Sequence, residues 1–344
     1  MDRWRWTMAL VVCALSCVGV GTTLAQTGRG SAPRTADGWP DLQGVWDFRT
    51  LTPLQRPADR VEKAVLTAEE AAEIEARAVQ SAIDADRPSE VRTEPLPVGA
   101  PVGGYNNFWF DRGAGVVDDN RTSLIVSPEN GRVPPLQPAL TMVELSLGED
   151  LPGTRPVRVR AAGIGADSWE DRGLAERCLL GFNSGPPVVP AGYNQNLQIF
   201  QTPDHVVILH EMVHDARVVP LDGRPHLPEG VRQWMGDSRG YWDGDTLVVE
   251  SRNYTDKTAS FSPSVTMAAG EGTTLSLTER FTRVAEDTLL YEFTVDDATT
   301  FTAPITAQIP MKRGEAMFEY ACHEGNYGLP NILAGARQAE NAAR

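Results

Sequence analysis

The chain has 344 residues and a formal net charge of -15 at pH 7. Such an acidic surface repels nucleic acids and anionic membrane surfaces, so neither is expected as a partner. No segment reaches the roughly 20 consecutive apolar residues of a membrane-spanning helix. We therefore expect no membrane span and a small-molecule ligand or substrate as partner, with the oligomeric state left open.

The first 25 residues have the organisation of a signal peptide. Basic Arg3 and Arg5 precede an apolar run from Met8 to Val20, and small residues lead up to Ala25. This order predicts cleavage near Ala25 and a periplasmic or secreted protein. Lipid attachment at Cys17 is an alternative that the residues before it disfavour.

Two cysteines, Cys178 and Cys322, lie outside this predicted signal peptide. In an oxidising compartment two remaining cysteines most simply form one disulfide bond. Two buried free thiols are the alternative.

Residues 26–104 are predicted to form an N-terminal arm, a helix and a linker. Thr67-Ala68-Glu69-Glu70 is a capping box followed by apolar residues at helical spacing, which predicts a helix over about 67–86. Prolines and glycines over 88–104 predict a linker or surface loop.

Residues 105–344 are predicted to form an antiparallel β domain with a C-terminal tail, because short apolar runs alternate with turn residues. The predicted strands are Phe108–Phe110, Thr122–Ser127, Gln198–Gln201, His205–Met212, Ala216–Val219, Thr246–Glu250, Thr274–Arg283, Thr288–Val295, Thr302–Pro310 and Met317–Tyr320.

The clearest pair of strands lies between Thr274 and Val295, where apolar residues alternate on both sides of a turn at Glu286-Asp287. This pattern predicts a β-hairpin. Many short strands and a single strong helix favour a mainly β fold, either an antiparallel barrel of the calycin or lipocalin type or a sandwich, with the arm and one helix outside.

His210-Glu211-Met212-Val213-His214 matches the zinc-protease pattern H-E-x-x-H. That chemistry requires a helix, which places both histidines on one face. The β-branched residues on both sides favour strands instead, and in a strand the two histidines would lie roughly 13 Å apart. We therefore expect no metal or other cofactor, and keep zinc or another divalent metal bound by His210, His214 and His226 as an alternative.

Two segments are dense in histidine, carboxylate, arginine and aromatic residues. A histidine beside a carboxylate is a plausible general base, and arginine binds anionic or oxygen-rich groups. The candidate catalytic residues are His214, Asp215, His323 and Glu324. The candidate substrate-binding residues are Arg217, Arg224, His226, Trp234, Trp242 and Tyr327.

Some phrases are also family markers, namely His-Asp-Ala-Arg from His214, Leu-Asp-Gly-Arg-Pro-His from Leu221, Trp-Asp-Gly-Asp-Thr-Leu-Val-Val from Trp242 and Tyr-Ala-Cys-His-Glu-Gly-Asn-Tyr-Gly from Tyr320. With them the chain resembles an uncharacterised family of exported bacterial proteins from about Leu42 to Arg337. The resemblance implies export and no particular activity.

The resulting hypothesis is an exported β-barrel that binds a small molecule and acts on it by His/Asp/Glu acid–base chemistry, as a lyase, isomerase or hydrolase. A non-catalytic ligand-binding or surface protein is the first alternative. A metal-dependent hydrolase that uses the H-E-M-V-H histidines is the second.

Overall fold

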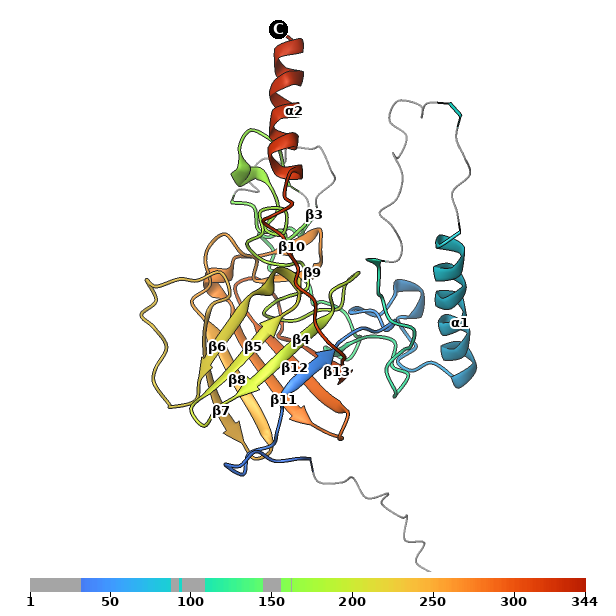
Figure 1. Cartoon of the computed structure of the whole chain (residues 1–344), viewed down its shortest axis with the longest axis vertical. Helices are drawn as coiled ribbons and strands as arrows, with labels where there is room; N and C mark the ends of the chain where they lie inside the picture. The colour runs from blue at the N-terminus through green and yellow to red at the C-terminus, as the bar shows by residue number, and fades with distance from the viewer. Residues whose placement is uncertain (1–31, 88–92, 95–108, 145–155, 162) are drawn as a thin grey trace, which may run out of the picture.

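The computed structural model describes residues 32–87, 93–94, 109–144, 156–161 and 163–344. Its main feature is a nearly closed antiparallel β-barrel, which confirms the predicted mainly β fold (Figure 1). In the order in which neighbours pair, the strands are β6 (Ala216–Pro220), β5 (His205–His210), β4 (Asn196–Gln201), β1 (Gly44–Asp47), β13 (Ile305–Arg313), β12 (Thr288–Asp296), β11 (Ser276–Arg283), β8 (Thr246–Arg252) and β7 (Asp237–Asp243). A short strand, β2 (Ile125–Ser127), also pairs with β13.

The predicted hairpin is confirmed as β11 and β12. Leu277 pairs with Val295, and Phe281 pairs with Tyr291. The pleat of a strand sends alternate side chains to opposite faces, so these residues all point into the barrel and are buried.

The sheet ends at β6 and β7, which lie side by side without strand pairing. Gly240 on β7 faces β6 at this seam. A Cβ atom at Gly240 would lie 2.8 Å from Val219 Cγ1 and 2.7 Å from Leu221 Cδ2. Because such distances are too short for carbon atoms, the missing side chain is what lets the two strands approach.

Large side chains fill the barrel interior. Trp46, Phe281, Tyr291 and Phe293 are each at most 1% exposed and belong to one continuous core. Small barrels are commonly filled by side chains in this way. Room for a ligand therefore lies at the end of the barrel rather than in its interior.

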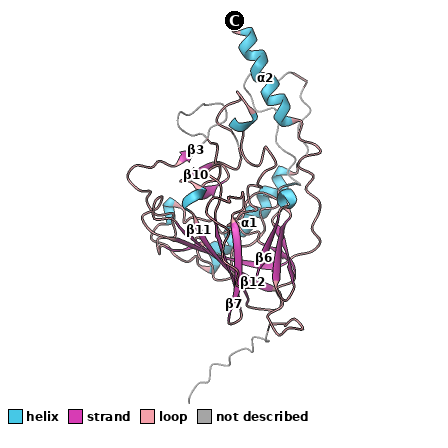
Figure 2. Cartoon of the chain, turned by 90° about the vertical axis from the view of Figure 1, so that its left-hand side faces the viewer, coloured by secondary structure: helices cyan, strands magenta, loops and turns pink. Residues whose placement is uncertain are grey.

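A layer of loops, which we call the cap, covers one end of the barrel (Figures 1 and 2). The cap comprises residues 156–161, 163–189 and 254–275, together with β3 (Val143–Glu144). Within it β9 (Phe261–Ser264) and β10 (Met267–Ala269) pair with β3 in a small sheet. The polar side chains described below lie where the cap meets the barrel.

The predicted helix is confirmed as α1 (Ala68–Ala85), which begins with a complete capping box between Thr67 and Glu70. The C-terminal tail was predicted without a second helix, and this is wrong, since Gly328–Ala342 forms helix α2, which projects away from the barrel (Figure 1). None of its residues is buried, so this helix does not pack on the barrel.

The arm was expected to lie outside the core, and this is wrong for Gly44–Asp47. This segment is β1, which pairs with β4 and β13 inside the sheet. A boundary at residue 105 therefore does not separate the arm from the barrel.

Two predicted strands are wrong. Trp109 and Phe110 are not part of a strand, and Phe108 lies outside the described residues. Met317–Tyr320 is an irregular segment, in which the Phe318 backbone N–H donates to the Glu211 carboxylate instead of to a neighbouring strand.

The predicted disulfide between Cys178 and Cys322 is present. Disulfides of this kind persist in oxidising compartments. The predicted signal peptide and most of the predicted linker lie outside the described residues. Within the described part of the chain, neither helix is both long and apolar enough to cross a membrane.

Candidate functional site

Polar side chains meet at the capped end of the barrel. Arg217 on β6 is 4% exposed, although its neighbours Ala216 and Val218 are exposed, because the pleat turns it alone of the three into the barrel. Glu279 on β11 occupies the same kind of inward position between Leu277 and Phe281 and is 0% exposed. A charge at such a position requires a partner.

Arg217 and Glu279 supply that partner to each other through two parallel hydrogen bonds. One joins Arg217 Nη2 to Glu279 Oε1 at 3.0 Å, and the other joins Nη1 to Oε2. The Tyr291 hydroxyl donates to Glu279 Oε1 at 2.8 Å and accepts from the Val188 backbone N–H at 3.1 Å. The carboxylate is therefore fixed from two sides, and the contact of Tyr291 with Val188 ties the cap to the barrel.

His210, the last residue of β5, points into the same end of the barrel. It is 1% exposed, and neither ring nitrogen has a hydrogen-bond partner among the described residues. Burial, followed by the positive charges of Arg217 and Arg160, lowers its pKa to about 3. The imidazole is therefore neutral at physiological pH, with one N–H donor and one acceptor nitrogen unused.

Tyr254 and Arg160 complete the arrangement from the cap. Tyr254 is 2% exposed, and its hydroxyl has no hydrogen bond of ordinary geometry to a described residue, although Ser251 lies near enough to lower its pKa. Burial and the Glu279 carboxylate together raise the Tyr254 pKa, so the phenol stays protonated. For Arg160 burial lowers the pKa to about 10, which leaves it charged at neutral pH.

We call these side chains the polar cluster. Its members are Arg160, His210, Arg217, Tyr254, Glu279 and Tyr291. Each member lies close enough to at least one other member for the charge of one to shift the pKa of the other. The cluster contains several hydrogen-bond donors and a single carboxylate.

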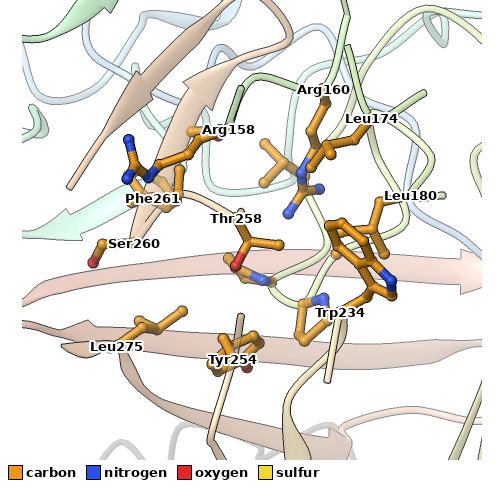
Figure 3. Close-up of a pocket in the computed structure, with 16 residues that line it drawn as sticks. Arg158, Arg160, Leu174, Leu180, Trp234, Tyr254, Thr258, Ser260, Phe261 and Leu275 are labelled. Atoms are coloured by element: carbon orange, nitrogen blue, oxygen red, sulfur yellow. The ribbon is translucent and has the colours of Figure 1, made fainter. Parts of the chain in front are cut away.

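A small cavity adjoins the cluster beneath the cap. Arg160, Thr258 and Trp234 surround it, with Tyr254 at its base (Figure 3). Its free volume of about 20 Å³ holds roughly one water molecule. A polar ligand group of that size could contact the cluster there.

A larger cleft of about 540 Å³ opens beside this cavity, between β6 and the segment Arg232–Ser238. Arg217 lines the cleft, and Trp234 lines both the cleft and the cavity. The barrel seam therefore opens at its capped end, and this opening gives a route from solvent to the polar cluster.

The structure places two of the predicted substrate-binding residues, Arg217 and Trp234, at this end of the barrel. His226 is close to the cleft rather than in it, since its Nδ1 lies 3.0 Å from Oδ2 of Asp237, a cleft residue.

The other three predicted substrate-binding residues lie elsewhere. Arg224 is exposed and paired with Asp222 in the loop after β6. Trp242 packs against the core, and its ring stacks on that of Trp39 with 5.1 Å between the centroids. It lies four residues along β7 from Ser238, which lines the cleft, and four residues of a strand span roughly 13 Å. Tyr327 is 73% exposed at the start of α2. The structure therefore does not bring Arg224, Trp242 and Tyr327 together at the cleft, and their binding roles remain predictions.

The predicted catalytic residues lie next to the disulfide. Met212 and Val213 of the 3₁₀ turn η4 (Met212–His214) pack on Cys178, with Cys322 against the same group. The backbone segments of His214-Asp215 and His323-Glu324 therefore lie in one region around the disulfide. The side chain of His214 lies outside the description, Asp215 is partly exposed, and His323 and Glu324 are exposed.

The H-E-x-x-H motif does not form an α-helix. Strand β5 ends at His210, two residues earlier than predicted, and η4 follows with Val213 in the left-handed region at φ 63°. The helical arrangement of zinc proteases is therefore excluded. Among the described side chains, no group of three or more His, Cys, Asp or Glu could hold a metal ion.

Sequence reasoning missed Arg160, Tyr254, Glu279 and Tyr291. The sequence could have indicated Glu279, because this carboxylate lies between Leu277 and Phe281 on the apolar face of the predicted hairpin. Tyr291 also lies on the apolar face of that hairpin, between Leu289 and Phe293, but a tyrosine is less unusual there than a carboxylate. Arg160 and Tyr254 lie outside the predicted strands and reach the cluster only through the cap.

Comparison with models of known protein families and with curated proteins finds no match for this chain.

Proposed function

We propose that this protein binds a small, oxygen-rich molecule at the capped end of the barrel and acts on it by acid–base chemistry. One observation carries the proposal, namely the buried His210 imidazole, whose ring nitrogens both lack a hydrogen-bond partner in the described part of the chain, beside a fixed arginine. Buried polar groups in proteins are almost always hydrogen-bonded. A ligand with polar atoms would satisfy this imidazole.

The roles follow from the state of each group. Neutral His210 can accept a proton at one nitrogen and donate a hydrogen bond from the other. Protonated Tyr254 can donate a hydrogen bond to a ligand oxygen. Arg217 is held in place by Glu279, and its Nε, which has no hydrogen-bond partner among the described residues, can donate to negative charge that develops on the ligand.

A bound ligand would also adjust the basicity of His210. Its pKa is low partly because Arg217 and Arg160 lie nearby. Negative charge on a ligand offsets that effect and raises the pKa toward the operating pH, where a general base works best. Proton transfer of this kind serves a lyase, an isomerase or a hydrolase.

His214 and His323 remain proposed bases of the same reaction, since the disulfide brings their backbone segments close to the end of β5. If one of them is the base, His210 binds and orients the ligand instead. Separate His→Gln variants of His210, His214 and His323 distinguish these assignments.

A second candidate is a non-catalytic ligand-binding protein. It is favoured by the filled barrel interior and by the low pKa of His210, which makes the free imidazole a weak base. In that case the polar cluster binds a ligand and releases it unchanged.

The test begins with a screen of small organic molecules by thermal shift on the exported protein, followed by NMR detection of turnover and of proton exchange with solvent. His210→Gln should weaken binding and abolish turnover. His205→Gln is the matched control, because His205 lies on the same strand but pairs with Asp204 at the other end. Unchanged turnover in His210→Gln refutes the role of His210, and binding without any turnover establishes the second candidate.

A further inference from the structure

The polar cluster carries one more positive than negative charge. Glu279 neutralises Arg217 through the paired hydrogen bonds, and His210 is neutral. The remaining positive charge belongs to Arg160. This arginine is partly buried, and its guanidinium forms no hydrogen bond or ion pair with any described residue. Removing a charge from water without giving it a partner is costly. The guanidinium of Arg160 should therefore bind an anion favourably.

Arg158, close to Arg160 in the sequence, provides a comparison, because its guanidinium is paired within the protein. Arg158 lines the same cavity, but its Nη2 lies 2.9 Å from Glu271 Oε1, and its Nε donates to the Asp256 carbonyl at 3.0 Å. The guanidinium of Arg160 instead points into the cavity, toward the space between Thr258 and Trp234 (Figure 3).

An aromatic pocket of about 490 Å³ continues from this cavity, and Val189 and Ser262 line both. Phe182 and Tyr193 meet edge to face at 5.1 Å, and Phe110 meets Tyr193 at 5.9 Å, so aromatic rings form much of its wall. Such a surface accepts an apolar or aromatic body.

We infer that the ligand is an organic anion, with its charged group on the Arg160 guanidinium and an apolar or aromatic body in the pocket formed by Phe110, Phe182 and Tyr193. This inference rests on the proposed site at the capped end of the barrel. A carboxylate suits the small cavity better than a phosphate because it has fewer oxygens, and it can still pair with arginine through two hydrogen bonds.

The probes are phenylacetate and its neutral amide phenylacetamide, each measured by calorimetry and by thermal shift at constant ionic strength. Phenylacetate should bind the wild-type protein, and phenylacetamide should bind about tenfold or more weakly, since a hydrogen-bonded charge contact is lost. Arg160→Gln should remove that difference. Arg158→Gln should retain it.

A second measurement makes the result independent of the probe. Without ligand, Arg160→Gln should raise the thermal midpoint or leave it unchanged, because it removes an uncompensated charge, whereas Arg158→Gln should lower it. Equal affinities for phenylacetate and phenylacetamide, a lack of phenylacetate binding to the wild type, or a large loss of stability in ligand-free Arg160→Gln overturns the inference. Phenylacetate that binds through Arg160 while His210→Gln has no effect on ligand binding or turnover refutes the proposed function of His210 alone.

Discussion

Arg217 on β6 and Glu279 on β11 form a buried ion pair between strands that are not neighbours in the sheet. Strands β7 and β8 separate them around the barrel. Since no strand pairing crosses the seam between β6 and β7, this ion pair is a direct polar connection from β6 to the far side of the seam. It also fixes the arginine that faces the cleft.

Removing one partner of this pair should be strongly destabilising. Arg217→Met leaves Glu279 buried with only Tyr291 as a partner, and we expect a loss of about 3–5 kcal/mol in the free energy of unfolding. Urea denaturation monitored by tryptophan fluorescence measures it. The double variant Arg217→Met/Glu279→Leu should recover much of the loss, because no uncompensated charge remains. If the single and double variants are equally unstable, the pair is not the source of the effect.

The low pKa of His210 predicts a specific dependence of stability on pH. The unfolded imidazole takes up a proton near its ordinary pKa of 6.5, whereas the folded one resists protonation down to about 3. Between these values the unfolded state binds more protons, so stability rises with pH. The free energy of unfolding should fall by about 2 kcal/mol from pH 7 to pH 5 through this group alone.

The measurement compares urea midpoints of the wild type and His210→Phe at several pH values between 5 and 8. The variant lacks the ionisable ring, so its stability should fall less on acidification. His205→Gln serves as the control for replacing a histidine on the same strand, since His205 is partly exposed at the other end of β5. Parallel pH curves for the wild type and His210→Phe would show that His210 titrates normally in the folded protein.

The sequence was informative where a strand buries one apolar face. In β11 and β12 large side chains alternate, so the hairpin and its faces could be predicted. In β7 the inward residues include Ser238 and Gly240, which are small because the seam closes there, and no apolar alternation remains to reveal the strand. Strand β1 was hidden in a stretch rich in turn residues, and its place in the sheet depends on partners far along the chain.

The candidate site divides in the same way. The positions of Arg217 and Trp234 at the cleft agree with the candidates taken from the sequence, where both lie in a segment dense in histidine and aspartate, while their binding role remains a prediction. Glu279 could have been found as a carboxylate on an apolar strand face. Arg160 and Tyr254 could not, because their proximity depends on how the cap folds over the barrel, which no local pattern in the sequence encodes.

The disulfide should stabilise the C-terminal segment as well as the fold. The sulfur atoms of Cys178 and Cys322 close a loop with a sequence separation of 144. Asn326 Nδ2 donates to the Glu176 carbonyl at 2.7 Å nearby, and Arg337 Nη1 donates to the Asp167 carbonyl at 2.7 Å. Cys178→Ser/Cys322→Ser should lower the free energy of unfolding by about 2–5 kcal/mol.

The same double variant should expose the C-terminal segment to proteolysis, because fewer contacts then hold it on the cap. Limited proteolysis with mass spectrometry reports cleavage after Arg313 and beyond. Thiol titration of the unfolded, unreduced wild type should find no reactive thiol from these two cysteines. Two titratable thiols, or a cleavage pattern identical to that of the wild type, would contradict the role assigned to the disulfide.

Closure of the barrel depends on Gly240, and its replacement gives the sharpest test of the seam. In Gly240→Ala the new methyl group would lie 2.8 Å from Val219 Cγ1 and 2.7 Å from Leu221 Cδ2. The end of Leu221 can rotate away, but the β-branched Val219 is stiff, so β6 and β7 must separate. We expect a loss of about 1–3 kcal/mol in the free energy of unfolding.

Gly230→Ala is the matched control, because a Cβ at Gly230 would have no atom within 4 Å, and this residue lies in the loop between the same two strands. Its stability should equal that of the wild type within experimental error. Separation of the strands should also widen the cleft beside Arg217, so hydrogen exchange of the β6 amides should accelerate in Gly240→Ala and stay unchanged in Gly230→Ala. Wild-type stability together with wild-type exchange in Gly240→Ala would mean that β6 and β7 do not pack against each other as the structure shows.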